Sequence, residues 1–196
     1  YFWAASMAID SRAKYQALKY LNQSLMINPS EKKLDDYILY WKQAVNNNKN
    51  YKVSKTGGKK LPLVSIVTPS YNGGKYIEEC IQSVLNQDYP YIEHIIQDGS
   101  STDKTKKVLK IYQKSQYQHR IKIFVEPDNG QSDALNKAIQ KTKGDIILVL
   151  NADDMLLPYA VSWGIEQMKN YPEYGVIYGD SYIIDENGQI IDINKS

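Results

Sequence analysis

Between residues 61 and 150 the chain alternates short apolar runs with longer amphipathic segments. The apolar runs predict strands at 63–68, 92–97, 121–125 and 145–150. The segments between them carry apolar residues at helical spacing and predict helices over 75–87, 103–114 and 130–142. Strands that alternate with helices of this length are typical of right-handed βαβ units. The pattern therefore predicts an α/β fold, with a mainly parallel twisted sheet flanked by helices.

Residues on the N-terminal side of this region have a different pattern. Residues 1–50 carry two amphipathic stripes separated at Asn28-Pro29, which predicts a short N-terminal α-helical hairpin or the end of an upstream helical module. Residues 51–61 are polar and basic and predict an exposed linker. The main domain is therefore predicted to occupy 62–196.

The C-terminal part continues the alternation of elements. After Pro158, apolar residues at helical spacing predict a further helix. Gly175–Tyr178 is predicted to be a fifth strand, and residues 182–192 are predicted to form a hairpin that turns at Asn187-Gly188.

The apolar run Ile146–Leu150 continues directly into Asn151-Ala-Asp-Asp154. A run that is apolar at every position predicts a strand buried on both faces, and parallel sheets bind ligands beyond the carboxyl ends of their strands. Two adjacent carboxylates repel each other unless they are solvated or neutralised by a hard cation such as Mn or Mg. Asp153 and Asp154 are therefore candidate metal ligands. The alternative is a helix N-cap ahead of Pro158.

Polar residues follow each of the four predicted strands, and parallel strands place these segments at one edge of the sheet. A tyrosine beside an aspartate at that edge could hold a nucleobase by stacking and by accepting a ring N–H. Taken singly, Tyr71-Asn-Gly-Gly74 and Asp98-Gly-Ser-Ser101 are better explained as turns. The sequence contains neither GxGxxG nor GxxxxGK[ST], which argues against a dinucleotide oxidoreductase and a P-loop NTPase.

Charge divides the chain, whose net charge is +2. Residues 1–61 hold 11 Lys or Arg and 4 Asp or Glu, whereas residues 62–196 hold 13 and 18. A solvated helical face accounts for the basic part, and contact with an acidic membrane surface or partner is the alternative. The basic part does not interleave aromatics and glycines as a nucleic-acid-binding surface would, so no nucleic acid partner is expected.

The cysteine content and the lengths of the apolar runs bear on location. The single cysteine, Cys80, rules out an internal disulfide, and its place on an apolar helix face predicts a small buried hydrophobe. No apolar run approaches the roughly 18 residues that span a bilayer, and no signal peptide is visible. We therefore expect a cytoplasmic protein, with peripheral association at the inner face of the membrane as the further option.

Four ordered motifs together resemble the family 2 glycosyltransferases, inverting enzymes of the Rossmann-like GT-A fold, over about residues 62–192. The motifs are Val67-Thr-Pro-Ser-Tyr-Asn72, Ile95-Ile-Gln-Asp-Gly-Ser-Ser-Thr-Asp103, Glu126-Pro-Asp-Asn-Gly-Gln-Ser-Asp-Ala-Leu-Asn136 and Asn151-Ala-Asp-Asp154. The resemblance implies transfer of a sugar from a nucleoside-diphosphate donor, with a UDP-sugar favoured, to a hydroxyl of a glycan or lipid-linked acceptor. It implies inversion at the anomeric carbon and assistance by Mn or Mg.

The resemblance also implies roles for individual residues. Thr68, Pro69 and Tyr71 would hold the nucleobase, and Asp98 would accept the uracil N–H. Gln131 and Asp133 would lie beside the diphosphate or the donor sugar. Asp153 and Asp154 would stand for the catalytic DxD motif, which contacts the ribose or sugar and the diphosphate-bound metal. Asn151 and Ala152 would belong to the nucleotide-binding residues.

Three features depart from the family pattern. The paired acid after the second strand is Asp98-Gly99, and the first DxD position is Asn151, which is an uncharged oxygen ligand. The family's general base lies well downstream of the DxD, so it is expected beyond Ser196, with Asp180 as a weaker candidate. Two alternatives therefore stay open: a non-catalytic nucleotide-sugar-binding or interaction domain of the same fold, and a nucleotidyltransferase, for which Tyr71-Asn-Gly-Gly-Lys75 is a poor loop.

Overall fold

The structure of the protein is a computed structural model. It describes residues 2–5, 61–117, 119–186 and 188–195. The chain divides into two compact units. One is Leu61–Leu156, and the other takes Leu157–Ser196 together with the N-terminal residues. Each unit is described by itself.

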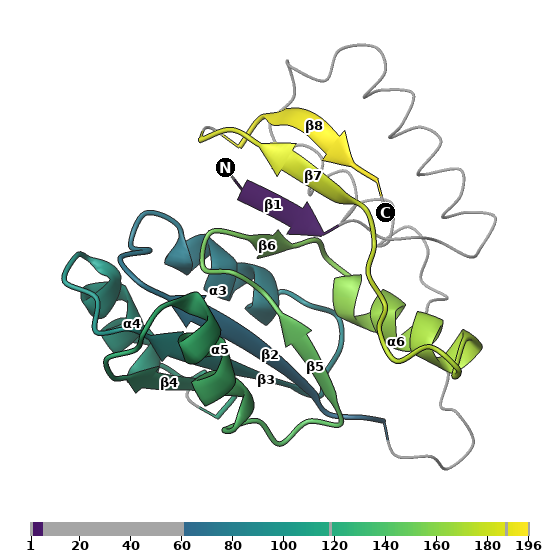
Figure 1. The fold of residues 1–196 in the computed structure, drawn as a ribbon, viewed down its shortest axis with the longest axis horizontal. Helices are drawn as coiled ribbons and strands as arrows, with labels where there is room; N and C mark the ends of the chain where they lie inside the picture. The colour runs from purple at the N-terminus through teal and green to yellow at the C-terminus, as the bar shows by residue number, and fades with distance from the viewer. Residues whose placement is uncertain (1, 6–60, 118, 187, 196) are drawn as a thin grey trace. The chain divides into compact units, whose positions relative to one another are not determined.

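The Leu61–Leu156 unit is built on a four-stranded parallel sheet (Figure 1). Its strands lie in the order β4-β3-β2-β5, so the two earliest strands are central. The strands are β2 (Val64–Ser70), β3 (Ile92–Asp98), β4 (Ile121–Val125) and β5 (Ile146–Val149). The connecting helices are α3 (Ile77–Leu85), α4 (Thr105–Gln113) and α5 (Gln131–Ile139). The predicted parallel α/β arrangement is confirmed, and the two-residue strand β6 (Met155–Leu156) closes the unit.

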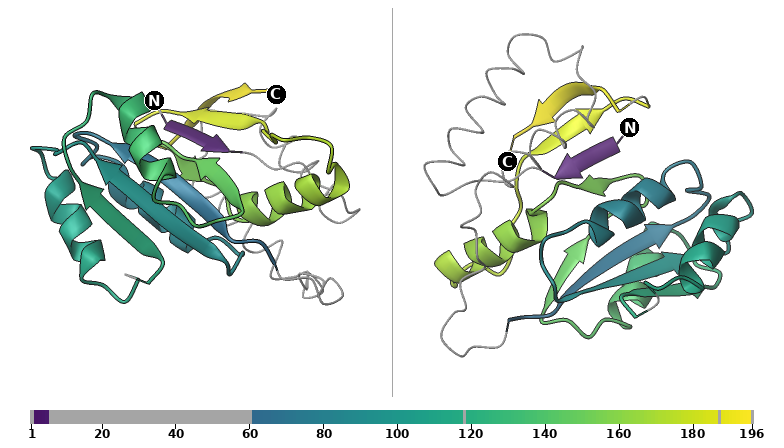
Figure 2. Two further views of the ribbon diagram at one scale, coloured as in Figure 1. Left: turned by 60° about the horizontal axis from the view of Figure 1, so that its bottom comes forward. Right: turned by 180° about the vertical axis from the view of Figure 1, so that it is seen from behind.

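The helices cover opposite faces of this sheet (Figure 2). Ile77 and Ile81 of α3 pack with Leu109 of α4 against Ile96 of β3. On the other face, Ala138 of α5 packs against Val67 and Ile95 of the two central strands. Removing these apolar side chains from water is the main stabilising term for the unit. This packing holds the strands in place and so fixes the positions of their carboxyl ends.

β5 corrects one expectation, because it is not buried on both faces. Ile147 and Val149 are 43% and 53% exposed. They pair with Ser65 and Val67 and so share the face that carries α5. α5 packs over β2 and β3, while β5 is the last strand of the described sheet, so the helix does not cover it. An unbroken apolar run therefore formed a half-covered edge strand.

The second unit contains the predicted helix and hairpin. α6 (Ala160–Asn170) follows Pro158, and β7 (Ser181–Ile184) pairs antiparallel with β8 (Ile190–Asn194). The predicted strand at Gly175–Tyr178 is wrong: this segment has no regular structure, and Val176 and Tyr178 are among the most exposed apolar residues described. A short run flanked by glycines has weak strand propensity, and here it has no strand partner within the described residues.

The N-terminal helical prediction also needs correction where it can be compared. Phe2–Ala5 forms strand β1, which pairs antiparallel with β7. Phe and Trp favour strands, and the pairing satisfies backbone groups that a β-hairpin alone leaves open. The rest of the predicted helical hairpin and linker, residues 6–60, lies outside the described residues. Among the residues that the structure describes, no helix combines the length and apolarity needed to cross a membrane.

His94 of β3 is completely enclosed in the α3 and α4 side of the core. Its Nε2 lies 2.8 Å from Thr68 Oγ1. Burial, reinforced by the Arg120 charge, lowers the pKa of His94 to about 3. Between about pH 6.5 and pH 3 the His94 imidazole is therefore protonated in the unfolded chain and neutral in the native state.

We expect this difference in protonation to lower the free energy of unfolding as the pH falls below 6.5, the ordinary pKa of the imidazole. The slope contributed by one such group is at most about 1.4 kcal/mol per pH unit. Urea unfolding of the wild type and His94→Gln at pH 4.5 to 7.5 measures it, and the variant should show the shallower slope. His119→Gln, at an exposed position, is the control. Identical slopes in the wild type and His94→Gln would contradict the assignment.

Candidate functional site

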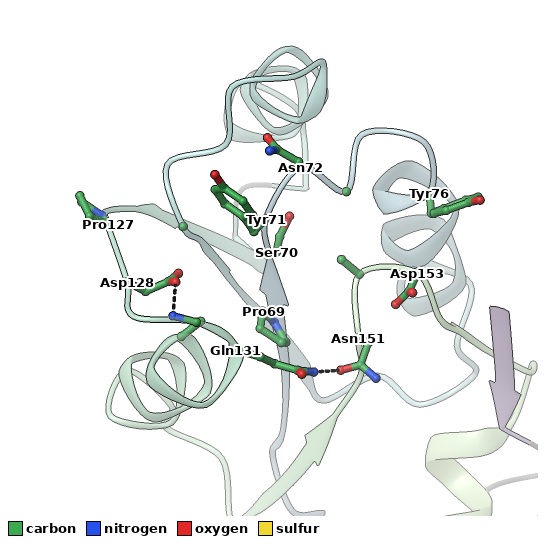
Figure 3. A pocket seen from close by; sticks show the side chains of 15 residues that line it. Pro69, Ser70, Tyr71, Asn72, Tyr76, Pro127, Asp128, Gln131, Asn151 and Asp153 are labelled. Atoms are coloured by element: carbon green, nitrogen blue, oxygen red, sulfur yellow. Dashed lines mark hydrogen bonds between the residues drawn. The ribbon is translucent and has the colours of Figure 1, made fainter. Parts of the chain in front are cut away.

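A pocket of about 840 Å³ lies at the carboxyl ends of the four parallel strands, within the Leu61–Leu156 unit. Segments that follow β2, β3, β4 and β5 all contribute to its wall (Figure 3). The lining residues are Pro69–Gly73, Tyr76, Gly99, Pro127, Asp128, Gly130, Gln131, Ala134 and Asn151–Asp153. The prediction that the four motifs converge at one edge of the sheet is confirmed. This is the usual position of ligand sites in open parallel sheets.

Hydrogen bonds fasten the loop after β2 to the loop after β3. Asn72 N donates to Ser101 Oγ at 2.8 Å, and Thr102 N donates to Asn72 Oδ1 at 2.9 Å. Gly99 N also donates to Ser70 O at 2.8 Å. Asn72 and Ser100 hold positive φ values of 51° and 64°, which non-glycine residues seldom adopt. Such backbone geometry persists where surrounding bonds enforce it, and it is common at functional sites.

Asp98 stabilises these two loops through hydrogen bonds to Ser101. It is fully buried, with Oδ2 accepting the N–H of Ser101 at 2.9 Å and Oδ1 accepting the Ser101 hydroxyl at 2.5 Å. The same hydroxyl oxygen accepts the N–H of Asn72. Asp98 thus orders the turn that both loops share, and it does not line the pocket. Thr68 is likewise fully buried against His94 and away from the pocket wall.

The two adjacent carboxylates after β5 have different surroundings. Asp153 is exposed and lines the pocket. Asp154 is 92% buried, and its Oδ2 accepts a hydrogen bond from Asn151 Nδ2 at 2.9 Å. The opposite end of that amide, Asn151 Oδ1, accepts from Gln131 Nε2 at 2.8 Å in the pocket. Asp154 therefore orients Asn151, while Asp153 presents its charge to the pocket.

The N-terminus of α5 forms another part of the wall. Gly130 precedes the helix with a φ of 106°, a conformation that favours glycine. Gln131 projects into the pocket toward Asn151 (Figure 3). Asp133 instead accepts the N–H of Asn129 at 2.9 Å and pairs with Lys137 at 2.9 Å, and these contacts lower the pKa of Asp133. Asp133 thus holds the residue that precedes the N-cap of α5, and it lies outside the pocket lining.

Of the residues singled out from the sequence, the structure brings a subset together at the pocket. Its lining includes Pro69, Tyr71, Gln131, Asn151, Ala152 and Asp153. Thr68, Asp98, Asp133 and Asp154 lie behind or beside it. Asp180 immediately precedes β7 in the other unit.

Sequence reasoning did not single out Asp128, whose carboxylate lines the pocket beside Gly99. The available signal was its place in the third motif, directly after a predicted strand and two residues before a glycine. Its Oδ1 accepts the N–H of Gly130 at 2.9 Å, so the loop geometry holds the side chain in place.

Cys80 is buried and connects α3 to the segment after β5. Its Sγ lies 3.4 Å from the carbonyl oxygen of Asn151, to which the thiol donates. Desolvation by burial raises the pKa of Cys80 to about 12. The thiol is therefore neutral at physiological pH, and its predicted role as a small buried hydrophobe is confirmed.

The model of the family described as "Glycosyl transferase family 2" matches residues 65–193 of this sequence. The match includes all four strand-end motifs and extends through the C-terminal hairpin. The chain belongs to glycosyl transferase family 2.

Curated relatives agree with this assignment. The chain is 41% identical over 93 residues to "Putative teichuronic acid biosynthesis glycosyltransferase TuaG" of Bacillus subtilis, covering 47% of this chain and 36% of the relative. It is 34% identical over 144 residues to "Chondroitin synthase" of Escherichia coli, covering 73% and 21%. The chain therefore spans well under half the length of these relatives.

Solved structures show the same fold at low sequence identity. The mannosyltransferase PcManGT from Pyrobaculum calidifontis, in complex with GDP-Man and Mn2+, has a TM-score of 0.52 and 22% identity, covering 80% of this chain and 44% of that one. S. aureus TarS 1-349 in complex with UDP-GlcNAc has a TM-score of 0.51 and 24% identity, covering 56% and 32%. These structures have the GT-A fold, so the predicted fold class is confirmed.

Proposed function

We propose that this chain contains the donor-binding part of a glycosyltransferase, which moves a sugar from a UDP-sugar to a hydroxyl of a glycan or lipid-linked acceptor. The observation that carries the proposal is the single pocket onto which all four family motifs converge, with an exposed aromatic ring and an exposed carboxylate in its wall. An aromatic ring suits a nucleobase, and a carboxylate suits a cation that accompanies a diphosphate.

The arrangement of the pocket supports one orientation of the donor. Tyr71 is 66% exposed, and Figure 3 shows it on the side of the pocket away from Asp153. A base stacked on Tyr71 would place the diphosphate toward Gln131 and the start of α5. The unpaired N–H groups and the dipole of a helix N-terminus favour an anion there.

The residues present fit a bound Mn or Mg ion. Asp153 supplies one carboxylate and Asn151 one amide oxygen, both of them oxygen ligands that such hard cations prefer. One or two protein ligands are typical when phosphate oxygens and water complete the shell, and the described residues contain no cluster of three or more His, Cys, Asp or Glu side chains able to bind a metal. When bound, the ion would neutralise the charge that develops on the leaving diphosphate.

The protein's own groups have separate parts in this scheme. Asp154 holds the Asn151 amide, and Gln131 fixes its oxygen on the pocket side. Transfer with inversion further requires a carboxylate that removes the acceptor proton while the hydroxyl attacks the opposite face of the sugar. We assign this base to a residue that does not line the pocket, with Asp180 as the weaker candidate in this sequence.

Thermal unfolding with a panel of UDP-sugars and GDP-sugars, with and without Mn, tests the proposal. A ligand that binds only the native state raises the midpoint, by RT ln(1 + [L]/Kd) in free energy. We expect a rise with a UDP-sugar that is larger when Mn is present. The donor found in this way is then assayed for release of the nucleoside diphosphate and, with acceptor, for the anomer formed.

Three outcomes would contradict the proposal or one part of it. Absence of any shift across the panel would remove the pocket as a donor site. Metal-dependent binding without release of nucleoside diphosphate, with or without acceptor, would instead favour a binding domain of the same fold. A retained anomer in the product would refute the inverting mechanism.

A further inference from the structure

We propose that Asp128, and not Asp98, is the carboxylate that reads the hydrogen-bonding edge of the nucleobase. This inference rests on the proposed function, because it concerns the same pocket. It assigns to the site a preference for bases that carry a ring N–H at that edge, such as uracil and guanine. Cytosine and adenine carry a ring acceptor there instead.

The first support is the position of the Asp128 carboxylate. It lines the pocket, and Oδ1 is fixed by the N–H of Gly130 at 2.9 Å. Within the described residues, Oδ2 accepts no hydrogen bond. One oxygen is thus held by the protein, while the other can accept a hydrogen bond from a ligand.

The second support is the close approach of this carboxylate to Gly99. A Cβ at position 99 would lie 2.5 Å from Asp128 Oδ2 and 3.1 Å from Asp128 Cγ. The absence of a side chain at Gly99 is therefore what allows the carboxylate to occupy its place in the pocket wall. Gly99 also joins the segment after β3 to the end of β2, because Gly99 N donates to Ser70 O.

The third support is the surroundings of Tyr71 and Asp98. Tyr71 presents an exposed ring in the pocket, and Figure 3 shows the Tyr71 and Asp128 side chains on the same side of it, away from Asp153. Asp98 is fully buried, and both of its oxygens accept hydrogen bonds from Ser101. A base stacked on Tyr71 therefore meets the half-buried carboxylate of Asp128, which lines the pocket on that side.

A ring N–H donates directly to such a carboxylate, whereas a ring acceptor leaves the carboxylate oxygen facing a lone pair. A charged hydrogen bond of this kind contributes enough for a preference of roughly tenfold or more. Replacing the carboxylate with an amide removes the discrimination, because an amide can present either a donor or an acceptor.

The test is isothermal titration of the full chain with UDP, CDP, GDP and ADP in the presence of Mn. We expect the wild type to bind UDP more tightly than CDP and, where purines bind, GDP more tightly than ADP. In Asp128→Asn the UDP-to-CDP preference should fall at least about fivefold, mainly through weaker UDP binding. UDP methylated at N3 should bind the wild type as weakly as CDP does.

Gly99→Ala provides a second variant that leaves the carboxylate in the sequence. Gly99 does not have a positive φ, and the added methyl group meets the end of a flexible side chain, so the chain should fold. It should displace the Asp128 carboxylate and lower the same preference. Asp98→Asn is the comparison: it should lower the unfolding midpoint, by loosening the Ser101 turn, while the preference persists.

The outcomes separate this inference from the proposed function. If the wild type binds UDP but Asp128→Asn keeps the preference, the inference is overturned and the donor site stands. If the preference disappears in Asp98→Asn instead, the base is read by Asp98 and the inference is likewise overturned. If the wild type binds none of the four nucleotides, both proposals fail.

Discussion

Replacing Asp153 with asparagine is expected to lower the rate of donor turnover by about 100- to 1000-fold. Asp153 is the exposed carboxylate after β5 that lines the pocket, so the change removes one negative charge from the proposed cation site. The fold should be unaffected, because Asp153 is solvent-exposed and the substitution keeps its size. The rate is measured as release of nucleoside diphosphate from the donor found by thermal unfolding, over a series of Mn concentrations.

Two further variants serve as controls for Asp153→Asn. Asp154→Asn replaces the charged acceptor of the half-buried Asn151 amide with a neutral one and should mainly destabilise the fold, by about 1–3 kcal/mol. Glu173→Gln, at an exposed position in the other unit, should change neither property. Wild-type turnover in Asp153→Asn would exclude this carboxylate from the chemistry and would undermine the proposed position of the diphosphate.

Replacing Gly144 with alanine should produce the largest loss of stability. A Cβ at this position would lie 2.5 Å from Ser65 Oγ, 2.6 Å from Ser65 N and 2.8 Å from Leu63 O. Two of these three atoms belong to the backbone and cannot rotate away. We expect a cost of about 2–4 kcal/mol from the clash and from weakened hydrogen bonds between β2 and the start of β5. Nucleotide affinity should fall as well, because β5 positions Asn151 and Asp153.

Two hydrogen bonds are the reason for the expected effect of Gly144 on the pocket. Gly144 N donates to Ser65 Oγ at 2.8 Å, and Asp145 N donates to Leu63 O at 2.8 Å. The unfolding midpoint, expected to fall by roughly 5–15 °C, measures the effect. Gly164→Ala is the matched control, because its Cβ would meet no atom within 4 Å and alanine favours the α6 helix. An unchanged midpoint in Gly144→Ala would show that β5 is not fastened in this way.

The local pattern of apolar and polar residues was sufficient to predict most helices and strands of the Leu61–Leu156 unit. The apolar runs of β2, β3 and β4 lie where the pattern predicts them, because β-branched runs bounded by turn residues have few alternatives. It failed at Gly175–Tyr178, where the residues favour a strand but no described neighbour pairs with it. It failed also at Phe2–Ala5, where pairing with β7 is a long-range contact that helical periodicity cannot reveal.

The sequence by itself determined the order of strands and helices, and with it the convergence of four motifs on one edge of the sheet. This follows because parallel βαβ units place every strand end on the same side. Only the tertiary structure decided which carboxylates face the pocket. Asp128 and Asp153 do so, while Asp98 and Asp154 turn inward to Ser101 and Asn151. Neighbouring positions in a loop have the same chemistry in the sequence, and the hydrogen-bond partners that distinguish them come from distant parts of the chain.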